Sequence, residues 1–135
     1  MERADPELTA QVAAAAPFTA FLGIEMVSAS PHEVRAQLAW SEDICTAGGV
    51  LHGGALMSLA DNTGGFCAFL NLPDGAAGTA TIESKTNFFG PVREGYLHAV
   101  SRPLHTGRRT IVVDTELYDD AGKLLARVTQ TQAVL

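Results

Sequence analysis

Residues 52–70 read HGGALMSLADNTGGFCAFL, and this stretch decides the fold. Its apolar side chains follow a helical rather than an alternating period and point all round the axis, which predicts one helix from His52 to Leu70, covered on most sides. The run Asn71-Leu72-Pro73-Asp74-Gly75 ends it. The apolar positions are Leu56, Met57, Leu59, Ala60, Phe66, Cys67, Phe69 and Leu70.

The segments on either side of this helix have the pattern of strands. Residues 24–30 and 33–41 predict a hairpin with one buried face, and residues 7–16 before it predict a short helix, followed by a turn near Pro17 and an apolar docking segment. Four strand-like runs follow the central helix, and their short turns would make them antiparallel. The runs are 79–89, 95–104, 110–118 and 124–134, with turns at Gly90-Pro91, His105-Thr106-Gly107 and Asp119-Asp120-Ala121-Gly122. A sheet must wrap the helix for both to bury their apolar faces, so the fold class is α+β.

The length and composition of the chain exclude several classes of protein. The 135 residues suit a single domain spanning 1–135, and the 47% hydrophobic and 18% charged residues are typical of a soluble globular protein. A net charge of -6 argues against a nucleic-acid partner, and the apolar stretch 55–70 is too polar to span a membrane. The N-terminus lacks the pattern of a signal peptide. Cys45 and Cys67 cannot form a disulfide framework or a four-ligand zinc site, so we expect free thiols in the cytoplasm.

The charge is unevenly distributed along the chain. Residues 85–109 contain five basic residues and one acidic residue, Glu94, although the whole chain is acidic. This stretch is either a local anion site or a chance cluster on a solvated face. The basic residues are Lys85, Arg93, Arg102, Arg108 and Arg109.

Asp61 is the main candidate for chemistry, because it lies in an apolar helix whose neighbouring residues offer no cation. Burying an unpaired carboxylate is costly, so Asp61 either acts in a reaction or lies at a cleft; the alternative is a narrow solvated stripe shared with Asn62. Gly53-Gly54 open the helix, where free N–H groups could bind a polarised carbonyl oxygen, although loop flexibility would also explain them. His52 is assigned a positioning role.

These residues carry a resemblance to a known family. Leu51-His52-Gly53-Gly54, with Asp61 eight residues after Gly53 and with the later run Phe89-Gly90-Pro91-Val92, resembles the hotdog-fold acyl-CoA thioesterases of the phenylacetate-catabolism (PaaI-like) and 4-hydroxybenzoyl-CoA type. The resemblance covers residues 18–134. It implies a curved antiparallel sheet around one long helix, subunits that pair their sheets edge to edge as homodimers, pairs of dimers forming tetramers, and hydrolysis that uses no metal and no cofactor.

The resemblance also implies roles for particular residues. The backbone N–H of Gly53 would polarise the thioester carbonyl, and Asp61 would be the nucleophile or the general base. His52 would shape the site, and the Thr81 hydroxyl would assist the carboxylate or its water. Many relatives have Asn or Gln six residues before the histidine, to hold the water or the acyl carbonyl, where this chain has Thr46.

Coenzyme A would give the basic stretch a purpose, because it carries a 3′-phosphate and a diphosphate. Arg108-Arg109-Thr110, and Arg93 beside Gly90-Pro91, could bind these groups through charge-assisted hydrogen bonds. Phe66, Phe69, Phe88 and Phe89 could line an acyl pocket or fill the core, and we favour the core.

The spacing of Gly53 and Asp61 has a consequence for assembly. Eight residues on one helix span about 12 Å, so one carbonyl cannot contact both, and an active site needs Gly53 from one subunit and Asp61 from another. We therefore expect a cytoplasmic, oligomeric acyl-CoA thioesterase acting on aryl or short- to medium-chain acyl groups. The alternatives are a hotdog dehydratase or hydratase, which would use a histidine base, and a non-catalytic acyl-CoA-binding module.

Overall fold

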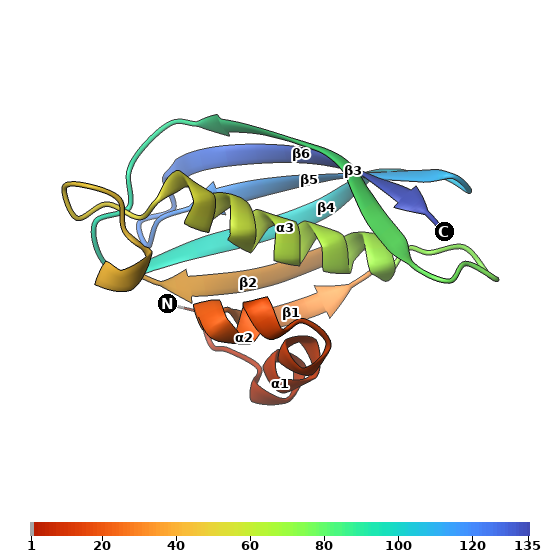
Figure 1. The fold of residues 1–135 in the computed structure, drawn as a ribbon, viewed down its shortest axis with the longest axis horizontal. Helices are drawn as coiled ribbons and strands as arrows, with labels where there is room; N and C mark the ends of the chain where they lie inside the picture. The colour runs from red at the N-terminus through yellow and green to blue at the C-terminus, as the bar shows by residue number, and fades with distance from the viewer. Residues whose placement is uncertain (1) are drawn as a thin grey trace.

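The computed structural model describes residues 2–135 as an antiparallel sheet that curves around one long helix (Figure 1). The sheet has six strands in the order β1-β2-β4-β5-β6-β3. The predicted α+β arrangement is confirmed. The elements are α1 (Pro6–Ala15), α2 (Pro17–Leu22), β1 (Glu25–Ser30), β2 (Glu33–Ala39), η1 (Glu42–Ile44), α3 (Gly53–Phe69), β3 (Thr79–Phe88), β4 (Tyr96–Thr106), β5 (Thr110–Tyr118) and β6 (Leu124–Val134).

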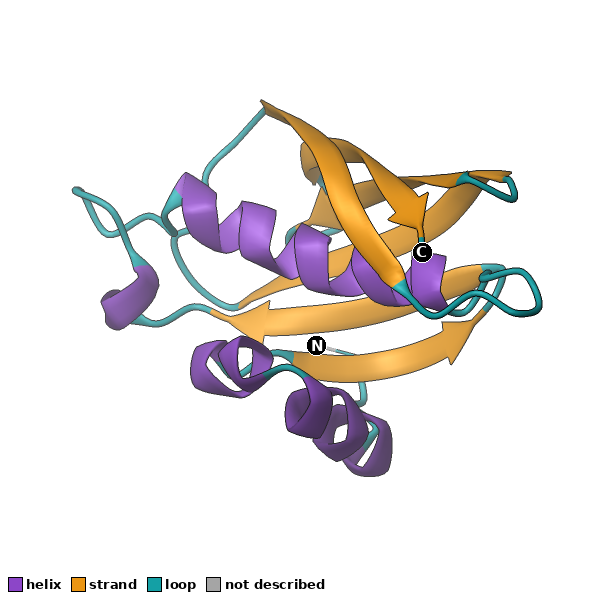
Figure 2. Ribbon diagram, turned by 45° about the vertical axis from the view of Figure 1, so that its right-hand side comes forward, coloured by secondary structure: helices purple, strands orange, loops and turns teal. Residues whose placement is uncertain are grey.

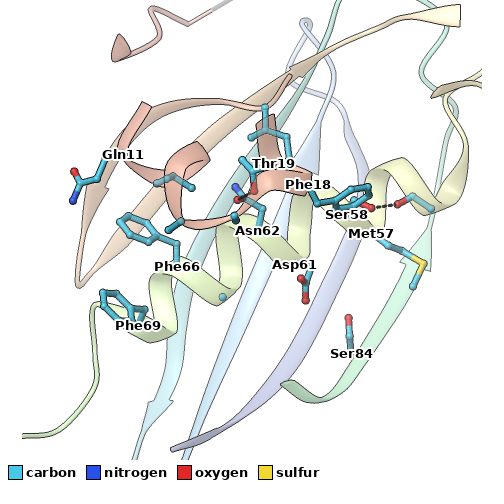
Figure 3. Close-up of a pocket in the computed structure, with 16 residues that line it drawn as sticks. Gln11, Phe18, Thr19, Met57, Ser58, Asp61, Asn62, Phe66, Phe69 and Ser84 are labelled. Carbon is cyan, nitrogen blue, oxygen red and sulfur yellow. Dashed lines mark hydrogen bonds between the residues drawn. The ribbon is translucent and has the colours of Figure 1, made fainter. Parts of the chain in front are cut away.

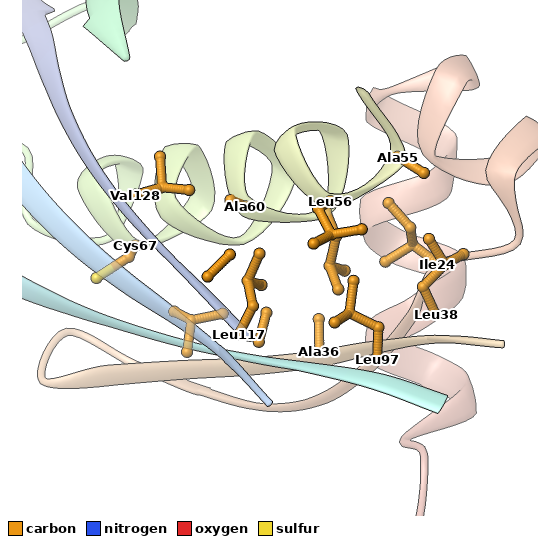
Figure 4. Packing of buried hydrophobic residues seen from close by; sticks show 14 of the residues in the cluster. Ile24, Ala36, Leu38, Ala55, Leu56, Ala60, Cys67, Leu97, Leu117 and Val128 are labelled. Atoms are coloured by element: carbon orange, nitrogen blue, oxygen red, sulfur yellow. The ribbon is translucent and has the colours of Figure 1, made fainter. Parts of the chain in front are cut away.

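The central helix α3 is one residue shorter at each end than predicted, because His52 is its N-cap and Leu70 its C-cap. One face packs on the sheet and forms the core, where Leu56, Ala60 and Cys67 lie against strands that are far apart in sequence (Figure 4). Leu59 on the same helix is fully buried. The opposite stripe is open in the single chain, so the expectation of a helix covered on most sides holds for only part of its circumference. Buried on α3 are Ala55, Leu56, Leu59, Ala60, Thr63, Gly64, Cys67 and Ala68.

The strand neighbours differ from the prediction at one place. Gly90-Pro91 was expected to be a hairpin turn between adjacent strands, but β3 pairs with β6, and β4 pairs with β2 and β5. The β1–β2 hairpin occupies the edge of β4 that β3 would have used, so residues 89–95 form a crossover. As a result β3 is the edge strand beside α3, and it is exposed along nearly its whole length.

The N-terminal segment forms two helices beside the β1 edge (Figure 2). Asp5 caps α1 by accepting a hydrogen bond from the Leu8 N–H (3.0 Å). Residues 17–22, expected to be only an apolar docking segment, form the helix α2. Gln37 of β2 is buried, and its amide group is hydrogen-bonded to Glu2 and Glu25. Within residues 2–135, no helix combines the length and the apolar character that a membrane crossing requires.

Candidate functional site

A cavity of about 840 Å³ lies between α3, the two N-terminal helices and β3 (Figure 3). Its walls are mostly apolar, and Asp61 is the only charged residue among those that line it within the described chain. The lining residues are Gln11, Val12, Ala15, Ala16, Phe18, Thr19, Ile24, Gly54, Met57, Ser58, Asp61, Asn62, Gly65, Phe66, Phe69 and Ser84. Asp61 therefore lies at a cleft, one of the two outcomes expected of an acid on an apolar helix.

The surroundings of Asp61 alter its acidity. Its side chain is exposed in the single chain, yet the protein atoms packed around it desolvate the carboxylate and raise its pKa; a hydrogen bond with the Thr81 hydroxyl lowers the pKa by less. The Ser84 hydroxyl points towards the carboxylate from β3 (Figure 3). A carboxylate with a raised pKa in an apolar cavity is a stronger base than an exposed one.

Thr81 is itself held in place by Gln132 of β6, a residue that the sequence interpretation missed. The Gln132 Nε2 donates to Thr81 Oγ1 (2.7 Å), and Thr79 Oγ1 donates to Gln132 Oε1 (3.0 Å). Because Gln132 is buried, these bonds fix the orientation of its amide. The lone pair of Thr81 that accepts from Gln132 is occupied, which leaves the Thr81 O–H free to donate towards Asp61.

At the N-terminus of α3, two backbone N–H groups come from the glycine pair, and only one of them lacks an acceptor in its own helix or cap. The His52 Nδ1 accepts a hydrogen bond from the Gly54 N–H (2.8 Å), which caps the helix and occupies that donor. The N–H of Gly53, the first helical residue, has no intrahelical acceptor because of its position. A Cβ at Gly53 would lie 3.2 Å from Cζ of Phe88, so this ring packs against the first turn. Of the two glycines, Gly53 is the one that can donate to a ligand.

The predicted site residues fall into two groups, one at the N-terminal end of α3 and the other around Asp61 in the middle of α3, at the opposite end of the sheet. The first group surrounds the start of α3: the Leu51 N–H bonds Val92 O (2.9 Å), which brings the 90–93 loop beside His52, and the Thr46 N–H bonds Val50 O (2.9 Å) in the preceding loop. The group consists of Thr46, His52, Gly53, Gly90, Pro91 and Arg93.

The second group lies around Asp61 and Thr81. Strand register sets it there, because Thr110 and Ala80 both pair with Ala133 of β6, which brings the β4–β5 turn to the Thr81 end of the sheet. The group consists of Asp61, Thr81, Arg108, Arg109 and Thr110. The eleven-residue strand β4 separates Arg93 from Arg108, so one chain does not bring all the predicted residues together.

Several cavity residues were assigned otherwise from the sequence. Asn62 accepts a hydrogen bond from the Thr19 hydroxyl (2.9 Å), which ties α3 to α2, so it does not lie on a solvated stripe. Phe69, Phe88 and Phe89 are about half exposed, so the preference for core positions was wrong for these three. Phe66 packs against the core cluster and also lines the cavity. The sequence did contain a signal for Phe69: Met57, Asp61, Gly65 and Phe69 follow one another at intervals of four residues, which places them on one face of the helix.

No metal-ligating cluster of three or more His, Cys, Asp or Glu side chains occurs within residues 2–135. Both cysteines are free. Burial raises the pKa of the Cys67 thiol to about 11, so it is protonated at neutral pH and is a packing residue.

Comparison with known proteins shows what the chain resembles. Residues 48–126 match the family described as the thioesterase superfamily. The 1,4-dihydroxy-2-naphthoyl-CoA hydrolase of Escherichia coli is 34% identical over 87 residues, which are 64% of this chain and 63% of the relative. The crystal structure of thioesterase HI1161 from Haemophilus influenzae superposes with a TM-score of 0.86 at 26% identity, covering 95% of this chain and 87% of that one. A mutant of thioesterase PA1618 from Pseudomonas aeruginosa gives 0.87 at 28% identity, covering 94% and 93%.

Proposed function

Because the chain belongs to the thioesterase superfamily and is a thioester hydrolase with the hotdog fold, we propose that it hydrolyses acyl-CoA esters to a free carboxylic acid and coenzyme A. The observation that carries this proposal is a single carboxylate, Asp61, in an otherwise uncharged cavity. The hydrolase that acts on 1,4-dihydroxy-2-naphthoyl-CoA supports the choice of a CoA ester.

In the proposed reaction, the thioester carbonyl oxygen accepts a hydrogen bond from the Gly53 N–H, at the positive end of α3. In one route, Asp61 takes a proton from water as the water oxygen bonds to the carbonyl carbon, the C–S bond breaks, and Asp61 passes this proton to the departing CoA sulfur. In the other route, Asp61 attacks the carbonyl carbon itself and expels the CoA thiolate to form an anhydride; water then hydrolyses the anhydride, which restores the carboxylate and supplies the proton that the thiolate takes up. The Thr81 hydroxyl, oriented by Gln132, stabilises the Asp61 carboxylate.

The active species is proposed to be a homodimer with two shared sites. In one chain Gly53 and Asp61 are separated by about 12 Å along α3. The exposed edge strand β3 offers unpaired backbone groups, and Ile82 on it is 63% exposed. Antiparallel pairing of two β3 strands would place the Gly53 end of α3 in one copy beside Asp61, in the middle of α3, of the other. We also propose, from the family resemblance, that two such dimers associate as a tetramer.

The same pairing would unite the two groups of predicted residues. The Gly53 end of one copy carries Arg93 and Thr46, and the Asp61 end of the second copy carries Arg108 and Arg109. Coenzyme A phosphates would then meet cations from both copies. Changing Arg108 and Arg109 to Ala should raise KM for a CoA ester with little change in kcat, because phosphate contacts are equal in the ground and transition states. A pantetheine thioester should be insensitive to the change; equal losses on both substrates would contradict the assignment.

The alternatives make different demands on the site. A dehydratase or hydratase would need a histidine base, and none of the described residues that line the cavity is a histidine. A non-catalytic binding module would bind CoA esters and release no thiol. A thiol-release assay over aryl- and alkyl-CoA esters tests the proposal directly: thiol release with turnover supports hydrolysis, and binding without release contradicts it.

The shared site is tested by mixing two inactive variants. Asp61→Asn removes the carboxylate, and Gly53→Pro removes the N–H donor at a helix position where proline is favoured. Gly53→Ala is the matched control, because it adds the same Cβ against Phe88 and keeps the N–H. Random exchange should restore about a quarter of wild-type activity, since half the dimers are mixed and each has one intact site. Chains that demonstrably exchange and stay inactive would exclude the shared geometry.

A further inference from the structure

Two adjacent glycines in the middle of α3 differ in what surrounds them. A Cβ at Gly64 would lie only 2.8 Å from the Gln130 Cδ, an atom of a fully buried side chain, so the packing of the sheet requires a glycine there. A Cβ at Gly65 would meet no atom within 4 Å. Neither residue has a positive φ. Gly65 therefore has no packing or backbone reason within the chain to be a glycine.

A glycine in a helix interior destabilises the helix relative to alanine. The open space at Gly65 belongs to the cavity, and Gly65 lies one turn beyond Asp61 on the same stripe of α3, about 6 Å further along the axis. Phe66 and Phe69 follow it, and Phe18 comes from α2 (Figure 3). Ala15 of α1 also lines the cavity. A larger side chain at position 65 would occupy the part of the cavity that lies between Asp61 and the rings of Phe66 and Phe69.

We propose that Gly65 determines substrate specificity by leaving room for a large apolar acyl group, which extends from Asp61 past Gly65 towards Phe66 and Phe69. This inference rests on the proposed function, because it takes Asp61 as the position of the thioester carbonyl. The substrate class is acyl-CoA esters with a bulky uncharged acyl group. An acetyl group would end before Gly65, and a dicarboxylic acyl group would find no cation among the residues that line the described cavity.

The test uses CoA thioethers, which bind in place of thioesters and cannot be hydrolysed. Calorimetry would give the Kd of S-ethyl-CoA, S-octyl-CoA and S-(2-phenylethyl)-CoA for the wild type and for Gly65→Leu. We expect the substitution to weaken the octyl and phenylethyl ligands at least tenfold more than the ethyl ligand. Ala15→Leu adds bulk to the α1 wall of the same cavity, so it should also weaken the octyl and phenylethyl ligands more than the ethyl ligand. Gly65→Ala should raise Tm by about 2–6 °C, because helix propensity improves without a clash.

Each outcome has a distinct meaning. Equal weakening of all three ligands, or no weakening of any, would overturn the role of Gly65. A loss of the dimer in Gly65→Ala, measured by sedimentation, would also overturn it, since the glycine would then serve a close contact between copies. Discrimination between the thioethers without thiol release from octanoyl-CoA would support the role of Gly65 and contradict the proposed hydrolysis of acyl-CoA esters. Thiol release without discrimination would support the hydrolysis and overturn the role of Gly65.

Discussion

The two faces of α3 differ in what they contribute. The face on the sheet carries Leu56, Leu59 and Cys67, all buried among strands that the chain reaches at widely separated points. The face on the cavity carries Met57, Asp61 and Phe69, which are exposed in the single chain. One helix thus holds the fold together on one side and presents a carboxylate on the other. The cavity face leaves apolar side chains exposed and carries a glycine in the helix interior, both of which lower stability, as we expect of a face that serves the proposed reaction.

Asp61→Asn should have the largest effect and should separate the two faces most sharply. We expect kcat to fall by more than about a thousandfold, because the base or nucleophile is lost, while the fold and substrate affinity stay largely intact. Steady-state kinetics and circular dichroism measure the two quantities. Activity within tenfold of the wild type would refute the assignment of Asp61.

Leu59→Ala, on the face of α3 that packs on the sheet, should lower stability and leave activity unchanged. Leu59 is fully buried between α3 and the sheet, and its truncation should lower the free energy of unfolding by about 2–5 kcal/mol through lost burial and the cavity that remains. Urea denaturation measures the loss. The kcat of the folded fraction should stay near the wild-type value, and a thousandfold loss in a folded variant would show that the two faces are not separable.

Gly64→Ala and Gly65→Ala form a matched pair one residue apart. The added methyl at Gly64 overlaps the buried Gln130 amide, so we expect a loss of about 1–3 kcal/mol of stability. At Gly65 the same methyl enters open space, and helix propensity should contribute about 1 kcal/mol of added stability. Thermal denaturation of both variants checks the signs. Equal destabilisation would mean that the cavity face is packed as tightly as the sheet face.

The pH dependence of stability should show the smallest effect. Desolvation raises the folded-state pKa of Asp61, so ionised Asp61 destabilises the fold, and this penalty grows as the pH rises through that pKa. Asp61→Asn should therefore have a higher Tm than the wild type at pH 7, and the difference should vanish below the usual Asp range. Asp74→Asn, in an exposed loop, is the control. In the wild type, kcat/KM should fall as acid protonates Asp61. An Asn variant no more stable at pH 7 would contradict the desolvation.

Local patterns were sufficient for most elements. The predicted bounds of β5 and β6 match the structure, and the central helix differs by one residue at each end, since the period of apolar residues is a property of adjacent positions. The edge position of β3 was not predictable, because it depends on which earlier strand pairs with β4. The buried Gln132 and Gln37 were also missed, since only tertiary partners make a buried amide tolerable.

The sequence by itself determined the candidate chemistry: a glycine pair at a helix start, and one acid eight residues later without a cation. These depend on residue types and on the fixed rise of an α-helix. The tertiary structure alone decided that the N-terminal helices form a wall of the cavity, that Gly65 faces open space while Gly64 does not, and that Arg93 lies at the other end of β4 from Arg108 and Arg109. Those outcomes depend on contacts between segments far apart in the chain, and no local period encodes which segments meet.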